Sequence, residues 1–219
     1  MSTNPYAKPK SRSGSALATL RRFVRPRPID EEQCELCSQA IAPRHPHLFD
    51  PANRQLLCAC EPCALLFSEQ AATRFLRVPT GSRFLPDFRL SDARWDSFLL
   101  PVDIAFFFDN RQTGKVTALY PSPGGPIESL LSLEAWNQLK QENPSLQNMQ
   151  PEVEALLVNR VQGARDCYLV PIDKCYELVG LIRSHWKGLA GGAEVWQEIG
   201  RFFANLKQRS QLIKEEADV

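Results

Sequence analysis

The chain has 219 residues, of which 43% are apolar and 23% are charged, and its formal net charge is +1. This length suits one ordinary domain or two small ones, and the apolar content is sufficient for a sizeable core. A charge near zero gives no overall attraction to nucleic acid, which we do not expect as a partner. The longest apolar stretch, residues 99–108, contains Pro101 and Asp103 and is far shorter than the roughly 20 residues of a bilayer span.

The first 28 residues are basic and rich in proline and serine, and they contain no acidic residue. This composition predicts a disordered arm with one short helix at 15–24, either solvated or docked on an acidic partner or RNA. Arg21 and Arg22 resemble the start of a twin-arginine export signal, but Arg-Pro-Arg-Pro follows them where an apolar run is required. We therefore expect a cytoplasmic protein, in which clustered cysteines are metal ligands or redox groups rather than disulfides.

Five of the seven cysteines lie within thirty residues, first as Cys34 and Cys37 and then as Cys58, Cys60 and Cys63. Two CxxC pairs separated by a loop can close a tetrahedral site of four thiolates. The symmetric choice of ligands is Cys34, Cys37, Cys60 and Cys63. Cys58 is surplus and could replace Cys60, because thiols two residues apart in an extended segment can point to the same side.

Two histidines, His45 and His47, lie between the cysteine pairs and are further alternative ligands for a mixed site. Zinc is the metal that the thiolates and the closed site favour. A rubredoxin-like iron site is the main alternative, although Ser38 and Ala64 stand where rubredoxin knuckles usually have glycine. An iron–sulfur cluster and a site without metal also remain open.

The flanks of the cysteines indicate a local fold for residues 29–78. Residues 56–58 suggest a short strand, and Glu61 and Pro62 are signals for the start of a helix. The first pair would lie on a turn, with a loop or hairpin between the pairs. This order of knuckle, hairpin and helix predicts a small treble-clef-like zinc module.

After a connector at 79–94, the pattern changes to that of an α+β domain over residues 95–219. The apolar runs predict strands at 98–108, 116–120, 153–158 (where a helix is also possible) and 168–170. A turn is predicted at 109–114 and a rigid, irregular loop at 121–126. Helices are predicted at 133–141, with Ser132 as the N-cap, and at 172–187 and 193–211. The predicted fold class is therefore α+β, with a short antiparallel sheet and C-terminal helices.

Signals for catalysis are weaker. Cys175 fits a buried, inert thiol, His185 fits a helix C-terminal partner, and Asp173 fits a carboxylate at a helix N-terminus. Glu152 and Glu154 fit a salt-bridged surface pair better than a catalytic one. The sequence has no phosphate-binding loop and no hydrolase or zinc-protease motif. An enzyme whose site joins the two domains is a third, weaker hypothesis, and a well-formed pocket containing two of Cys175, His185 and Asp173 would strengthen it sharply.

Several longer motifs resemble those of one uncharacterised bacterial family. They are Cys-Glu-Leu-Cys at 34–37, His-Pro-His-Leu-Phe-Asp at 45–50, Leu-Leu-Cys-Ala-Cys-Glu-Pro-Cys at 56–63, Ala-Leu-Tyr-Pro-Ser-Pro at 118–123, Pro-Glu-Val-Glu-Ala-Leu-Leu-Val at 151–158 and Val-Pro-Ile-Asp-Lys-Cys-Tyr-Glu-Leu-Val-Gly-Leu-Ile-Arg at 170–183. Genes of that family tend to lie beside those of actinobacterial-type, high-affinity [NiFe] hydrogenases. The resemblance carries no activity with it. It implies a non-enzymatic accessory protein that contacts a hydrogenase subunit or maturation factor or, alternatively, a rubredoxin-like electron-transfer protein.

Overall fold

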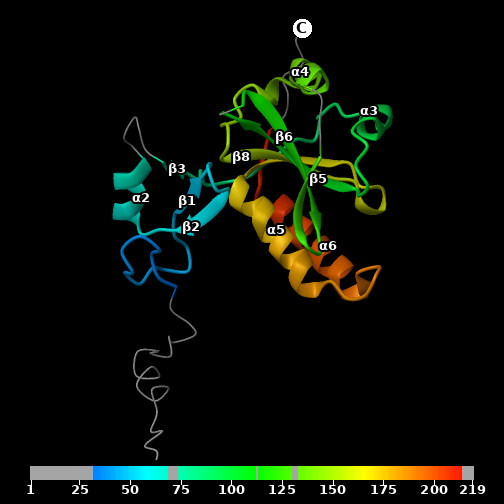
Figure 1. Ribbon diagram of the computed structural model, residues 1–219. Helices are drawn as coiled ribbons and strands as arrows, with labels where there is room; N and C mark the ends of the chain where they lie inside the picture. The colour runs from blue at the N-terminus through cyan, green and yellow to red at the C-terminus, as the bar shows by residue number, and fades with distance from the viewer. Residues whose placement is uncertain (1–31, 69–73, 112, 130–132, 214–219) are drawn as a thin grey trace, which may run out of the picture. The chain divides into compact units, whose positions relative to one another are not determined.

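A computed structural model describes residues 32–68, 74–111, 113–129 and 133–213 (Figure 1). Residues Gln33–Val219 form one compact unit. The predicted basic arm at 1–28 and its short helix lie outside the described residues, as does Ser132, the expected N-cap of the helix at 133–141. The fold is mixed α+β, with two separate sheets, as the sequence predicts.

The cysteine-rich segment builds the smaller sheet. Its strands are β1 (His47–Asp50), β2 (Gln55–Cys58) and β3 (Leu76–Arg77), and β1 pairs in antiparallel fashion with both others. Helix α2 (Glu61–Ser68) follows β2 after two residues. A hairpin therefore separates the two cysteine pairs, and the predicted strand at 56–58 and helix start at 61 are confirmed.

The larger sheet has seven strands in the order β10-β4-β9-β8-β5-β6-β7. Their bounds are β4 (Arg83–Phe84), β5 (Ile104–Asn110), β6 (Lys115–Ser122), β7 (Gly125–Ser129), β8 (Glu154–Asn159), β9 (Asp166–Pro171) and β10 (Gln211–Leu212). Every neighbouring pair is antiparallel except β10 with β4, which is parallel.

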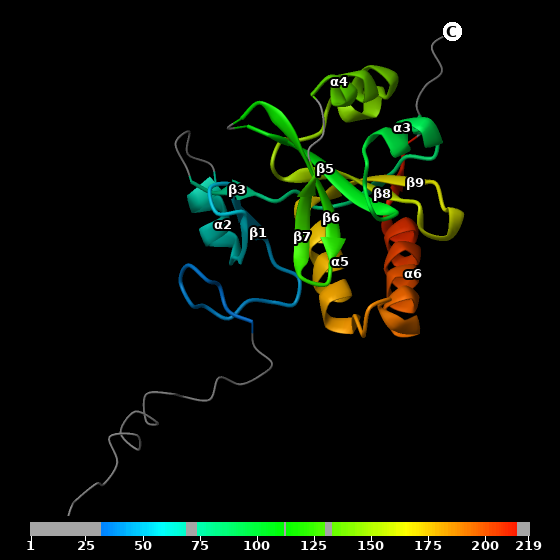
Figure 2. The same cartoon turned by 45° about the vertical axis from the view of Figure 1, so that its right-hand side comes forward.

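Helices cover both faces of this sheet. The long helices α5 (Ile172–His185) and α6 (Gly192–Arg209) lie on one face, and the shorter helices α3 (Asp92–Ser97) and α4 (Leu133–Glu142) lie on the other (Figure 2). Two single-turn 3-10 helices, Pro144–Leu146 and Val161–Gly163, complete the described elements. The apolar residues expected on the inner face of the last helix are all buried: Val195, Ile199, Phe202, Phe203 and Leu206.

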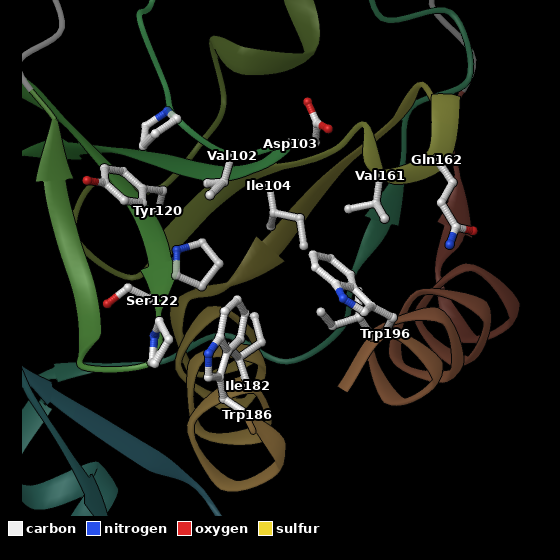
Figure 3. Close-up of a pocket in the computed structure, with 14 residues that line it drawn as sticks. Val102, Asp103, Ile104, Tyr120, Ser122, Val161, Gln162, Ile182, Trp186 and Trp196 are labelled. Atoms are coloured by element: carbon white, nitrogen blue, oxygen red, sulfur yellow. The ribbon is translucent and has the colours of Figure 1, made fainter. Parts of the chain in front are cut away.

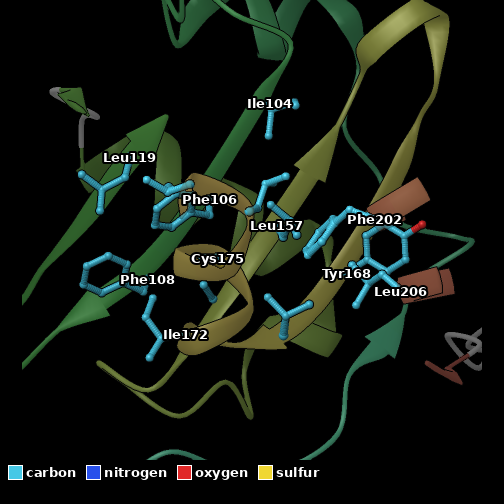
Figure 4. Packing of buried hydrophobic residues seen from close by; sticks show 14 of the residues in the cluster. Ile104, Phe106, Phe108, Leu119, Leu157, Tyr168, Ile172, Cys175, Phe202 and Leu206 are labelled. Carbon is cyan, nitrogen blue, oxygen red and sulfur yellow. The ribbon is translucent and has the colours of Figure 1, made fainter. Parts of the chain in front are cut away.

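Burial on both faces explains why the central strands are continuously apolar. In β5, Phe106 and Phe108 pack against the α5–α6 side (Figure 4), while Phe107 between them packs against the α3–α4 side. In β8, Leu157 and Leu156 divide in the same way. Successive side chains of a strand point to opposite faces, so a strand covered twice needs apolar residues at every position.

The sheet is wider than the short sheet that the sequence predicts. The segment predicted to be a connector, 79–94, contains β4, and Ser91 caps α3 by accepting a hydrogen bond from Arg94 N–H at 3.2 Å. The predicted irregular loop at 121–126 is instead a hairpin, in which Pro121 faces Pro126 and Ser122 faces Gly125. Prolines remove ladder donors, but Pro126 lies in the edge strand β7, where an absent donor is tolerated.

Candidate metal centre

The first cysteine pair lies on a tight turn. The N–H of Cys34 donates to the carbonyl of Gln39 at 2.8 Å, and the N–H of Ser38 donates to the carbonyl of Cys34 at 2.7 Å. Ser38 has a φ of 63°, in the left-handed region that glycine occupies without steric cost. The residue after Cys37 therefore has a left-handed backbone, at the position where rubredoxin knuckles usually have glycine.

The second pair lies where α2 begins. Cys60 directly precedes the helix and Cys63 lies in its first turn, and Ala64 N–H donates to the carbonyl of Cys60 at 2.9 Å. The N–H of Ala59 donates to the carbonyl of Pro46 at 3.0 Å and holds this segment beside the entry to β1. Local hydrogen bonding thus presents both thiols from one helical turn.

The structure brings all four predicted ligands together. The Sγ atoms of Cys34, Cys37, Cys60 and Cys63 lie within 4.8 Å of one another. The Sγ atoms of Cys37 and Cys60 are 3.7 Å apart. Metal–sulfur bonds of 2.3 Å in a tetrahedron place sulfurs about 3.8 Å apart, so the cluster fits one metal ion with four thiolates.

The thiols influence one another's ionisation. Burial opposes ionisation of Cys34, but hydrogen bonds from backbone N–H groups, chiefly that of Cys60, outweigh it and lower its pKa to about 6. The pKa of Cys63 is raised to about 12, first by its hydrogen bond with the Cys60 thiol and then by burial. Ionisation of one thiol therefore opposes ionisation of its neighbours, and a bound cation would offset the repulsion between the thiolates.

The alternative ligands form a second group. His45, His47 and Cys58 each offer one ligand atom, and these three atoms lie within 4.8 Å of one another. Strand register explains part of this arrangement, because His47 and Cys58 are directly opposite in the β1–β2 pair. The side chain of Cys58 therefore belongs with the histidines, while Cys60 belongs with the four-thiol group.

The other residues considered for chemistry are separated. Cys175 is fully buried, which raises its pKa well above the usual value, and His185 Nδ1 donates to the carbonyl of Leu181 at 2.9 Å in the last turn of α5. Asp173 lies in the first turn of α5, as predicted. Neither the cavity lined by Trp186 and Trp196 nor the cavity beside His45 and His47 contains two of these three residues.

The predicted surface pair Glu152 and Glu154 is a buried pair, with exposed fractions of 2% and 6%. Glu154 forms an ion pair with Arg83 at 2.8 Å, because the β4 strand that sequence analysis missed brings this arginine to the sheet. Glu152 accepts a hydrogen bond from Arg111 N–H at 2.9 Å. Both carboxylates are therefore structural, and they are satisfied by partners that are distant in sequence.

A cavity of about 500 Å³ is a feature that sequence analysis did not find (Figure 3). It is mostly apolar, and its lining includes Val102, Ile104, Tyr120, Ile182, Trp186 and Trp196. The hairpin of β6 and β7 contributes Pro121 and Pro123 to the same wall. The sequence feature that could have indicated this cavity is the pair of tryptophans, because they lie at the facing ends of two predicted helices.

Among the described residues, no helix combines the length and apolar character that crossing a bilayer requires. The fold and the four-cysteine group define a mixed α+β protein with a cluster able to bind a metal ion. The model of a family of unknown function, DUF5947, matches residues 33–210, and the chain belongs to this family. Neither the curated proteins nor the solved structures gave a match.

Proposed function

We propose that this protein is a non-enzymatic, zinc-stabilised accessory protein that binds another protein through the cavity between α5, α6 and the β6–β7 hairpin. The partner we propose is a [NiFe] hydrogenase subunit or one of its maturation factors, in keeping with the resemblance of the sequence motifs. The mostly apolar cavity with two tryptophans is the observation that supports protein binding, because buried aromatic anchors dominate protein interfaces.

The indole N–H groups of both tryptophans are already hydrogen-bonded, which leaves their rings available for apolar contact. The indole N–H of Trp186 donates to the carbonyl of Gly188 at 2.9 Å, and that of Trp196 donates to the carbonyl of Ala190 at 3.3 Å. Their ring centroids are 6.3 Å apart. Since both polar groups are already satisfied within the turn, a partner can cover the rings without leaving a buried donor unpaired.

The turn between α5 and α6 holds this arrangement in place. Gly191 has a φ of 83°, and a Cβ there would lie 2.9 Å from Val195 and 3.1 Å from the Trp186 ring. Only glycine combines this backbone with this close approach. We infer that the cavity is largely formed before binding, which reduces the entropy cost of association.

In this proposal the cysteine cluster is a structural metal site. Knuckle, hairpin and helix occur in the order of a treble-clef zinc finger, and four thiolates fill the tetrahedral coordination of zinc. We therefore assign zinc a structural role, in which it holds the small sheet and α2 together.

A binding measurement tests the proposal. Purified hydrogenase subunits and maturation factors are immobilised in turn, and the affinity of the full chain is measured by biolayer interferometry. Trp196→Ala should weaken binding at least tenfold, as expected for an aromatic anchor. Leu189→Ala is the matched control, because Leu189 is fully exposed in the same turn but outside the cavity lining. Equal binding by Trp196→Ala and wild type would reject this surface.

A second variant tests the basic arm. Removal of residues 1–28 should leave folding unchanged and weaken binding, because the arm carries only positive charge and would add attraction to an acidic partner. Unchanged affinity at low salt would exclude the arm from the interface.

A rubredoxin-like electron-transfer protein is the alternative, and one observation favours it. Cys37 is exposed while the other three ligands are buried, so one side of the cluster reaches the surface, as electron transfer requires. Metal analysis of protein purified without added metal separates the proposals. One iron per chain with a reducible visible spectrum would replace the zinc proposal, because zinc has no redox chemistry.

A further inference from the structure

We infer that His45, His47 and Cys58 form a second metal site, separate from the four-cysteine cluster, that binds a divalent first-row ion such as zinc with the fourth coordination position open to water or a small anion. The three ligand atoms lie within 4.8 Å of one another, and all three residues are partly buried. Two imidazoles and one thiolate form a donor set that suits zinc, and three protein ligands are typical of sites with an exchangeable position.

The β1–β2 hairpin builds this group. His47 and Cys58 are cross-strand partners, and such partners place their Cβ atoms about 4.5–5.5 Å apart on one face of the sheet. His45 precedes β1 by two residues, and its ring meets that of His47 edge to face, with centroids 4.9 Å apart. Backbone pairing therefore places His47 and Cys58 together, and the ring contact places His45 beside His47.

Hydrogen bonds fix the histidine tautomers. His45 Nδ1 lies 2.9 Å from the carbonyl oxygen of Ala42, and His47 Nδ1 lies 2.8 Å from Oδ2 of Asp173. Both partners are acceptors, so each Nδ1 carries a proton, and the tautomer that binds a metal through Nε2 is the one that these contacts favour. A carboxylate on the outer nitrogen orients a metal-binding histidine and strengthens it as a ligand.

Space for an added ligand is present beside the histidines. A cavity of about 250 Å³ is lined by both rings, by Asp173 and by the side chains of Arg44 and Arg77. Arg77 forms an ion pair with Glu61 at 2.6 Å, while Arg44 is exposed. The cavity therefore offers room on the histidine side of the group, and its lining carries both positive and negative charge, the latter from Glu61 and Asp173.

A purely structural role for the His47–Asp173 hydrogen bond is the competing explanation. The pair joins β1 to α5 across 126 positions of sequence, and it could serve only to fasten the small sheet. The two roles can be distinguished by measurement, because a purely structural contact affects stability without affecting the amount or the affinity of bound metal.

Metal stoichiometry distinguishes them. The full chain is saturated with zinc, gel-filtered and analysed by mass spectrometry of the metal. We expect two zinc ions per wild-type chain, one in His47→Ala and in Cys58→Ser, and two in the control His185→Ala. One zinc in wild type, or two in both site variants, would overturn the inference.

Two measurements remain informative if the variants fold poorly. Zinc-edge X-ray absorption of wild type should show imidazole nitrogen as well as sulfur, and coordination by sulfur alone would exclude the site. Asp173→Asn should lower the affinity for the second zinc ion by about 10–100-fold while the first ion stays bound. An unchanged affinity for the second ion would show that the His47–Asp173 contact is only structural. The result is independent of the hydrogenase proposal, which concerns a different surface.

Discussion

The small sheet and the seven-stranded sheet of this protein are stabilised by different means. One cluster of six buried residues lies within the cysteine-rich region, and three of these, Cys34, Cys60 and Cys63, are themselves predicted metal ligands. Phe49 of β1 packs instead in the core on the α5–α6 side of the large sheet. The large sheet instead buries aromatic and aliphatic side chains on both faces. We therefore expect the cysteine-rich region to depend on a bound metal for much of its stability, and the large sheet to depend on packing.

The largest expected effect is on the small sheet. Cys60→Ser should release the metal and unfold β1 and β2, because structural zinc supplies on the order of 10 kcal/mol in isolated zinc modules. Hydrogen exchange should show loss of protection at 47–58 and retained protection in β5 and β8. The control Cys175→Ala removes a buried thiol without loss of metal. Protection of β1 and β2 equal to wild type would show that this region is stable without its metal.

The matching change in the large sheet is Phe107→Ala. Phe107 is fully buried between Phe98, at a centroid distance of 5.5 Å, and Trp136, at 6.0 Å. Its truncation should lower the free energy of unfolding by about 3–5 kcal/mol and leave metal content unchanged. Denaturant unfolding measures the effect, and Phe67→Ala on α2 is the matched control, since Phe67 is 38% exposed. Similar losses for both variants would contradict this account of the core.

A pH-dependent change concerns the end of β1. Asp50 is buried and accepts a hydrogen bond from Arg74 Nε at 2.7 Å, which lowers the pKa of this carboxyl group. A lowered pKa stabilises the folded state above the unfolded value of about 3.9, and the stabilisation disappears as the pH falls through the folded pKa.

Asp50→Asn should therefore be less stable than wild type at pH 7, and the difference should narrow steadily below about pH 4. Thermal unfolding from pH 3 to 7 measures this difference between the two proteins. A stability difference between the two proteins that does not depend on pH would show that the substitution acts through side-chain packing and not through the charge of Asp50.

The smallest effect is expected at the knuckle. Ser38→Gly relieves a left-handed backbone but gives the unfolded chain more freedom, so the net gain should lie between zero and about 1 kcal/mol. Ser38→Ala, which keeps the Cβ atom, should give no gain. If glycine destabilised the region, the serine side chain would have to contribute a contact of its own.

Much of the local structure could be predicted from sequence. The spacing of the cysteines indicated that the two pairs would meet but left Cys58 as an alternative to Cys60, and the acid and proline at 61–62 indicated the start of α2. The strands β5, β8 and β9 were detectable because each is apolar and several residues long. The strands β4 and β10 have two residues each, too few for a periodic pattern, and β7 was hidden among prolines and glycines.

The sequence by itself determined that each CxxC pair presents two thiols together and which faces of the long helices are apolar, because both depend on spacings within a few residues. Only the tertiary structure decided that Cys58 lies opposite His47 and that Asp173 reaches the same histidine. Strand register and contacts over 126 positions depend on how whole elements pack, and no local pattern specifies them. For the same reason, the cavity lined by Trp186 and Trp196 exists only because α5 and α6 lie on one face of the sheet.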